Sequence, residues 1–193
     1  MWVRKSSIRP VPSFARIHSG AVDRVRNELT LESSDSQDRL DQAYEDFADT
    51  QPALADHVGS ILGRSLGDAT LALGYFLSLS IWMAFDRYQG SALRQISEAE
   101  LKATRQLFAL DESIRESEPN EVLETDDVVS MEQPALVAFV HEHVQATLNA
   151  EGSRVDADEL RLIYRMVLIE ILALSYAVEA PIGFPLARIE ASA

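Results

Sequence analysis

Apolar residues recur along this chain at spacings of three and four, which place side chains on one face of an α-helix. The clearest stripes in the first half are Leu40, Tyr44 and Phe47, and then Leu54, Val58, Ile61 and Leu62. No stretch alternates apolar and polar residues between turn residues, as a half-buried strand does. The pattern therefore predicts an all-α fold without a sheet.

Residues at the expected helix ends sharpen these boundaries. Ser97 and Glu100 fit a capping box, and Ile96 and Leu101 flank it at the positions of a hydrophobic staple. Asp156 offers a second cap of the same kind. The expected helices cover residues 21–29, a segment ending near Thr50, Pro52 to Gly67, a segment capped by Asp68 and ending at Gly90, residues 97–117, and a segment from Asp156 to just before Pro181.

Two of these helices are apolar on most faces, which predicts that they lie at the centre of the fold. They contain Leu71–Phe85 and Leu162–Val178. The first run is shorter than the roughly 20 residues that cross a bilayer, and Arg165 and Glu170 interrupt the second. We therefore expect two buried core helices that pack against each other, and no transmembrane segment.

A short internal repeat supports this arrangement. Gln51-Pro52-Ala53-Leu54 recurs as Gln133-Pro134-Ala135-Leu136. The apolar registers before and after both copies also match, with a short insertion in the second copy. The repeat predicts two three-helix units, residues 36–90 and 118–180, joined by a linking helix at residues 97–117. The whole chain would then be an extended basic arm (residues 1–19) and a single-domain bundle (residues 20–193) of about seven to eight helices with two central apolar helices.

Charge divides the chain into two parts. The net charge of the sequence is −14, but residues 1–26 carry six basic side chains and only Asp23, a net +5. The remaining residues have 11 basic and 30 acidic side chains, a net −19. This strongly acidic part of the chain repels phosphate backbones, which argues against nucleic-acid binding as the main activity. We expect the basic arm to lie across the acidic body or a sister subunit; contact with nucleic acid or an anionic membrane is the alternative.

Cysteine usage and the N-terminal composition bear on the compartment. The sequence has no cysteine, which excludes disulfides and thiolate chemistry and fits a reducing compartment. The arm lacks the apolar core of a secretory signal, and Pro10 and Pro12 interrupt the amphipathic helix of a transit peptide. A cytoplasmic protein is the expectation.

Glu170 is the charged residue in the most unusual place, inside the apolar run Val167–Leu172. Burial raises the pKa of a carboxyl group unless the group is paired. Glu170 could be an acid, a base or a ligand in a cavity between the central helices. The alternative is a structural carboxyl group hydrogen-bonded to a hydroxyl, to Trp82 or to Tyr75.

The histidines and the two glutamines are weaker candidates for a site. His141 and His143 are about 200° apart around a helix and cannot hold one metal ion together. His57 aligns with Phe139 in the repeat and is interpreted as a packed aromatic substitute, or as a partner of Ser60. Gln51 and Gln133 are expected to cap the helices that they precede; a contact with the other unit, or a shared polar site, is the alternative.

The motifs of common enzymes are missing from the sequence. There is no nucleophile elbow, Walker A sequence, Rossmann glycine run or HExxH pattern. We therefore assign no catalytic, cofactor-binding or metal-binding residue, expect no cofactor, and lean against an enzyme. Glu170, Gln51, Gln133, His57 and His141 remain the polar candidates.

Three functional hypotheses follow. The leading one is a non-enzymatic protein–protein interaction, scaffold or regulatory module that forms a homodimer through its arm and acidic face. The second is a small-molecule-binding or catalytic bundle with a central polar site around Glu170. The third is peripheral membrane association through the arm.

Overall fold

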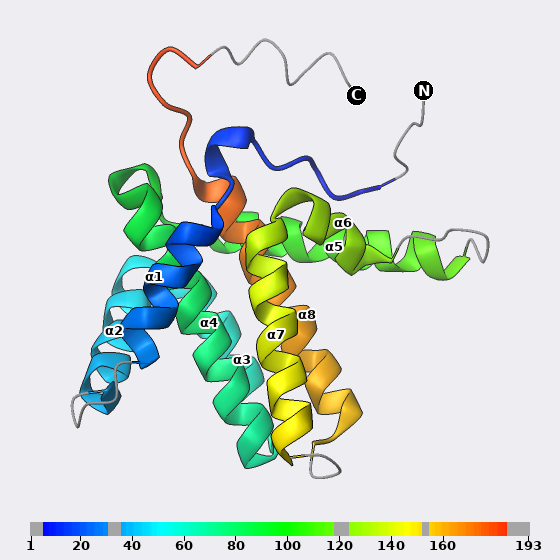
Figure 1. Ribbon diagram of the computed structural model, residues 1–193. Helices are drawn as coiled ribbons and strands as arrows, with labels where there is room; N and C mark the ends of the chain where they lie inside the picture. The colour runs from blue at the N-terminus through cyan, green and yellow to red at the C-terminus, as the bar shows by residue number, and fades with distance from the viewer. Residues whose placement is uncertain (1–5, 31–35, 118–123, 152–154, 185–193) are drawn as a thin grey trace.

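The helical periodicity of the sequence is realised as an all-α single-domain bundle in the computed structural model (Figure 1). The structure describes residues 6–30, 36–117, 124–151 and 155–184. In these residues it has eight α-helices and no strand. They are α1 (Ser19–Thr30), α2 (Ser36–Thr50), α3 (Pro52–Leu62), α4 (Asp68–Gln89), α5 (Glu98–Ser117), α6 (Thr125–Glu132), α7 (Pro134–Glu151) and α8 (Ala157–Ala177), with short 3-10 helices η1 (Ser13–Ala15) and η2 (Gly90–Ala92).

Most of the predicted helix ends are confirmed. The hydroxyl of Ser97 accepts from the Glu100 N–H at 3.3 Å, and the Glu100 carboxylate accepts from the Ser97 N–H at 3.0 Å, which completes the capping box of α5. The side chain of Asp156 accepts from the first N–H groups of α8. Gly90 ends α4 with a φ of 52°, a left-handed conformation that glycine adopts without strain.

Two predicted helix ends are wrong. Asp68 does not cap α4; Gly67 is the N-cap and Asp68 is the first helical residue, where its charge still favours the positive end of the helix dipole. The preceding helix α3 ends at Leu62 rather than near Gly67. After Gly63 the regular bonding stops, since the Arg64 N–H donates to the Ile61 carbonyl oxygen, three residues earlier, at 3.2 Å, which tightens the last turn.

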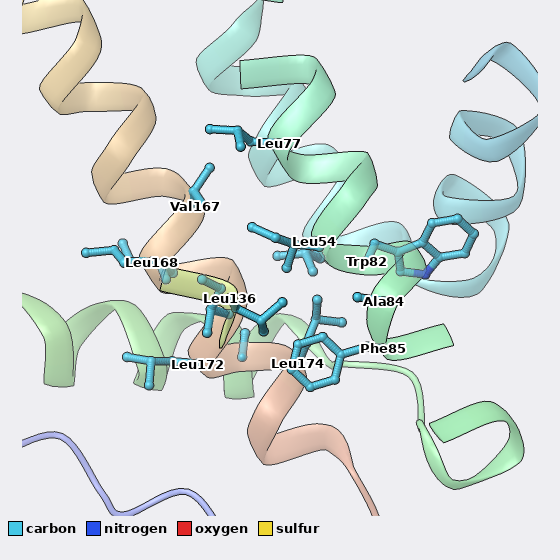
Figure 2. Packing of buried hydrophobic residues seen from close by; sticks show 14 of the residues in the cluster. Leu54, Leu77, Trp82, Ala84, Phe85, Leu136, Val167, Leu168, Leu172 and Leu174 are labelled. Carbon is cyan, nitrogen blue, oxygen red and sulfur yellow. The ribbon is translucent and has the colours of Figure 1, made fainter. Parts of the chain in front are cut away.

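Helices α4 and α8 lie side by side at the centre of the bundle, as the sequence predicts, and they run parallel. Their starts are joined by the Gly67 N–H, which donates to Glu159 Oε2 at 2.9 Å. Beyond their ends, the isolated bridge between Leu93 and Val178 joins the segments that follow the two helices. Figure 2 shows Leu77 and Val167 directed into the space between the two helices.

The close approach of α4 to its neighbours depends on Gly74. A Cβ atom at this position would lie 2.7 Å from Leu62 Cδ2 and 2.8 Å from Ile163 Cδ1. Gly74 has no positive φ, so packing between α3, α4 and α8 rather than backbone conformation favours glycine here, and a larger residue would displace these terminal methyl groups.

Helix α4 with η2 (Asp68–Ala92) is long and apolar enough to cross a membrane. However, 67% of its most apolar window is buried inside the protein. That burial is typical of the core helix of a soluble protein and gives no sign of a membrane span.

The helices of the two halves have corresponding neighbours. Helix α1 packs on α4 and α7, whereas α5 packs on α8 and α3. Helix α2 packs on α3 as α6 packs on α7. The internal repeat itself stays a prediction, but these contacts would extend its unit from three helices to four. Helix α5 would then be the counterpart of α1 rather than a linking helix.

Candidate functional site

Gln51 lies at the junction between α2 and α3, fully buried, with φ −133° and ψ 55°. Its Oε1 accepts from the Ile96 N–H at 2.9 Å, and its Nε2 donates to the Arg94 carbonyl oxygen at 3.0 Å. It makes no side-chain bond to α3, so the capping role predicted for it is not found. The side chain instead holds the extended segment that precedes α5.

Gln133 does the same at the junction between α6 and α7, with φ −134° and ψ 63°. Its Oε1 accepts from the Ile17 N–H at 3.0 Å, and its Nε2 donates to the Ala15 carbonyl oxygen at 2.9 Å and to Ser175 Oγ at 2.8 Å. Both N–H groups of this amide are used within the protein. Gln133 therefore fixes the segment that precedes α1 and has no donor left for a ligand.

The part of the arm that the structure describes lies across its own acidic body (Figure 1). The Val11 N–H donates to Glu132 Oε2 at 2.8 Å, and the Tyr176 hydroxyl donates to the Arg9 carbonyl oxygen at 2.6 Å. The Ser6 hydroxyl donates to Asp111 at 2.7 Å. The first of the two placements expected for the arm is thus found, and homodimerisation through the arm stays a prediction.

Glu170 is completely buried on the face of α8 that packs on α4. Among the described residues, neither of its carboxyl oxygens has a hydrogen-bond partner, so the predicted bonds to Trp82 or Tyr75 are not present. The Ser78 hydroxyl, also without a partner, faces it outside hydrogen-bond geometry. Burial raises the pKa of Glu170 well above its usual value, and Ser78 opposes this only in part. Burial therefore favours the protonated, uncharged form of this carboxyl group.

Glu170 lies away from the best-formed cavities in the described part of the chain, and none of these five cavities has Glu170 in its lining. A catalytic acid or a ligand needs a cavity that admits substrate. Glu170 is therefore a buried acid that none of these five cavities reaches, which does not support the central-site hypothesis.

His141 belongs to a surface chain of hydrogen bonds. Its Nε2 lies 2.5 Å from the Tyr164 hydroxyl oxygen, and that hydroxyl donates to Asp126 Oδ2 at 3.2 Å. Burial and the neighbouring charge of Asp126 raise the pKa of Tyr164, so the phenol stays protonated and is no activated nucleophile. Among the residues that the structure describes, no three histidine, aspartate or glutamate side chains gather as metal ligands.

His57 lies beside a cavity of about 850 Å³, which we call the His57 cavity, formed by α3, α5 and Arg165 of α8. Burial lowers the pKa of His57 to about 4, and the positive charges of Arg105, Arg165 and Arg64 act in the same direction. The Ser60 hydroxyl donates to the backbone carbonyl of His57 rather than to the imidazole, so the predicted serine–histidine pair is not formed.

A second concave surface was not predicted. Helices α2, α3 and α4 enclose an apolar groove of about 570 Å³, which we call the α2–α4 groove. Its lining consists of Tyr44, Gly59, Leu62, Asp68, Leu71, Ala72 and Tyr75. The apolar stripes assign Tyr44, Leu62 and Leu71 to the core, and periodicity alone does not show that the core remains open here. Leu71, at 38% exposure, marks the opening.

The fold and these surfaces define an all-α single-domain bundle with structural polar clamps and several concave surfaces, which include the His57 cavity and the α2–α4 groove. No protein-family model matches the chain, and neither a curated protein nor a solved structure matches it.

Proposed function

We propose that the protein is a non-enzymatic binding module whose α2–α4 groove receives a basic amphipathic helix of a partner protein. The observation that carries this proposal is an open apolar surface with an acidic border. Helices that dock in grooves insert a few apolar side chains from one face, and their other side chains contact the border.

The apolar part of the groove has the chemistry of a docking surface. The rings of Tyr44 and Tyr75 lie 5.7 Å apart and form one wall, while Leu71 is exposed at the edge. Tyrosine is enriched among the residues that dominate binding energy at interfaces. Gly59 keeps the floor open, since a Cβ at that position would meet only Tyr44 Oη, at 3.9 Å.

The border of the groove favours a basic partner. Asp68 lines it, and the charge of Asp41 reaches Tyr75, whose pKa is raised first by burial and then by that charge. Helix α2 also presents the exposed carboxylate of Glu45, next to Tyr44 in the sequence. Complementary charge steers a cationic helix to this side of the molecule and suppresses acidic partners.

Other features support a binding role over catalysis. Gln51 and Gln133 are used in structural bonds, Glu170 is sealed in the core, and Tyr164 is held protonated. Of the five polar candidates from the sequence, Gln51 and Gln133 are thus engaged in the fold and Glu170 is buried in the core.

A designed peptide tests the proposal directly. The probe is a fluorescein-labelled helical peptide of lysine and leucine with all leucines on one face, and the control is a shuffled peptide of the same composition. We expect saturable binding of the first peptide, measured by fluorescence anisotropy, and much weaker binding of the second.

Leu71→Asp separates groove binding from general attraction between opposite charges. The substitution adds negative charge, so a purely electrostatic complex would become tighter. The groove predicts the opposite, a loss of roughly tenfold or more in affinity, because an apolar contact is replaced by a charge. Met131→Asp on α6, at a residue that is 50% exposed and outside the groove, is the matched control. Equal effects of the two substitutions would refute the proposal.

A further inference from the structure

The His57 cavity collects positive charge in a strongly acidic protein. Lys102 and Arg105 from α5 and Arg165 from α8 line it. Arg165 is held by Glu112 through bonds of 3.0 Å to both carboxylate oxygens, so its charge is largely balanced. Lys102 and Arg105 are exposed to the cavity, and neither forms an ion pair with a described carboxylate.

Lone cations on a surface are common, so the surroundings decide whether these two are informative. The sequence has 31 acidic side chains against 17 basic ones, and six of the ten other arginines with described side chains form ion pairs. Asp56 and Glu98 line the same cavity without pairing with Lys102 or Arg105. The cavity thus keeps cations and carboxylates apart, an arrangement that suits a ligand carrying both an anion and hydroxyl donors.

The imidazole of His57 lies in the field of the arginines around this cavity. Its Nε2 is buried and has no hydrogen-bond partner among the described residues. Burial is the main reason that its pKa falls to about 4, but three guanidinium groups add to the effect. A protein of net charge −14 would on average raise the pKa of a histidine, so the potential at this position is locally positive.

We propose that the His57 cavity binds a small phosphorylated polyol. Arg105 and Lys102 contact the phosphate group, because a guanidinium donates two parallel hydrogen bonds to phosphate oxygens and an ammonium adds a point charge. Asp56, Glu98 and the Ser60 hydroxyl accept from the hydroxyl groups of the polyol. The cavity volume of about 850 Å³ is ample for a ligand of this size.

Calorimetric titration with three probes tests the ligand class. They are ribose 5-phosphate, inorganic phosphate and ribose. We expect saturable binding of ribose 5-phosphate at a single site, weaker binding of phosphate, and none of ribose. Absence of ribose 5-phosphate binding at millimolar concentration overturns the proposal, and so does binding of ribose as tight as that of its phosphate.

Two substitutions locate the site. Arg105→Gln removes an exposed guanidinium from the cavity and should weaken ribose 5-phosphate binding roughly tenfold or more. Arg161→Gln on α8 is the matched control, because Arg161 is exposed and lines a different cavity. If Arg161→Gln weakens binding as much as Arg105→Gln, the His57 cavity is not the site.

The imidazole of His57 provides a readout that does not depend on the heat of binding. Bound phosphate offsets the nearby guanidinium charges, so NMR titration should show the pKa of His57 rising when ribose 5-phosphate is present. Arg105→Gln alone should also raise that pKa, and added ligand should then change it little. An unchanged His57 pKa at saturating ligand contradicts binding in this cavity.

Discussion

Gln51 and Gln133 make the same hydrogen-bonded clamp in the two halves of the protein. Each follows one helix and precedes the next, with a φ within one degree of the other and ψ values of 55° and 63°. Each amide accepts from a backbone N–H, of Ile96 or Ile17, and donates to a carbonyl oxygen two residues earlier. Gln51 thus holds the segment before α5, and Gln133 holds the segment before α1.

Gln133→Leu should be strongly destabilising. The substitution places an apolar side chain of similar size in a fully buried position. It leaves the Ile17 N–H and the Ala15 carbonyl oxygen without partners. At ~1–3 kcal/mol for each buried unpaired group, the free energy of unfolding should fall by about 2–5 kcal/mol. Urea denaturation followed by circular dichroism measures the loss.

Gln145→Leu is the control for this prediction, because Gln145 on α7 bonds only to Asn149 in an exposed contact. Its effect should stay within about 0.5 kcal/mol. Comparable losses in the free energy of unfolding for Gln133→Leu and Gln145→Leu would show that the clamp stabilises the fold no more than an exposed hydrogen bond does.

Glu170→Gln should change how stability depends on pH. The folded-state pKa of Glu170 is raised, so above the unfolded-state value near 4.5 the native protein keeps a proton that the unfolded chain releases. The stability therefore falls with rising pH, by about 1.4 kcal/mol for each pH unit, until the folded-state pKa is reached. Glutamine does not titrate and should remove this slope. The free energy of unfolding of the variant should therefore rise relative to that of the wild type as the pH rises.

The measurement is a series of urea denaturation curves from pH 5 to pH 8. Glu116→Gln on α5, at an exposed glutamate, should keep the wild-type slope in that series. A Glu170→Gln protein that parallels the wild type over this range would mean that Glu170 is ionised in the fold.

Gly74→Ala tests the close contact of the central helices. The added methyl group would lie under 3 Å from atoms of Leu62 and Ile163, and the strain should cost about 1–3 kcal/mol in thermal or urea denaturation. Ile163→Val removes one of the two opposing atoms, so the double variant should recover part of that loss. Gly20→Ala, where nothing lies within 4 Å, should be neutral or slightly stabilising. Additive effects of Gly74→Ala and Ile163→Val would argue against their contact.

The helices of this protein could be predicted because their signals are local. The capping box at Ser97 and Glu100, the cap at Asp156 and the prolines at positions 52 and 134 each act within one turn. The pairing of α4 with α8 also followed, since two helices that are apolar on most faces must bury each other.

The clamps and the open surfaces could not be predicted in the same way. Gln133 bonds to residues 116 and 118 positions away, and no local pattern indicates those partners. Leu71 fits an apolar stripe as well as any core residue does, but no neighbouring helix covers it. Arg105 becomes part of a cavity only when folding brings α3 and Arg165 beside it. These features depend on tertiary contacts, which one sequence does not specify.

Site-directed disulfide trapping tests the binding function most directly. Because the sequence contains no cysteine, Leu71→Cys introduces a single thiol at the edge of the α2–α4 groove. The partner is the lysine–leucine helical peptide with one cysteine on its apolar face. We predict rapid formation of a mixed disulfide with Leu71→Cys, and slow formation with Met131→Cys or with the shuffled peptide. Equal trapping rates at positions 71 and 131 would contradict the account.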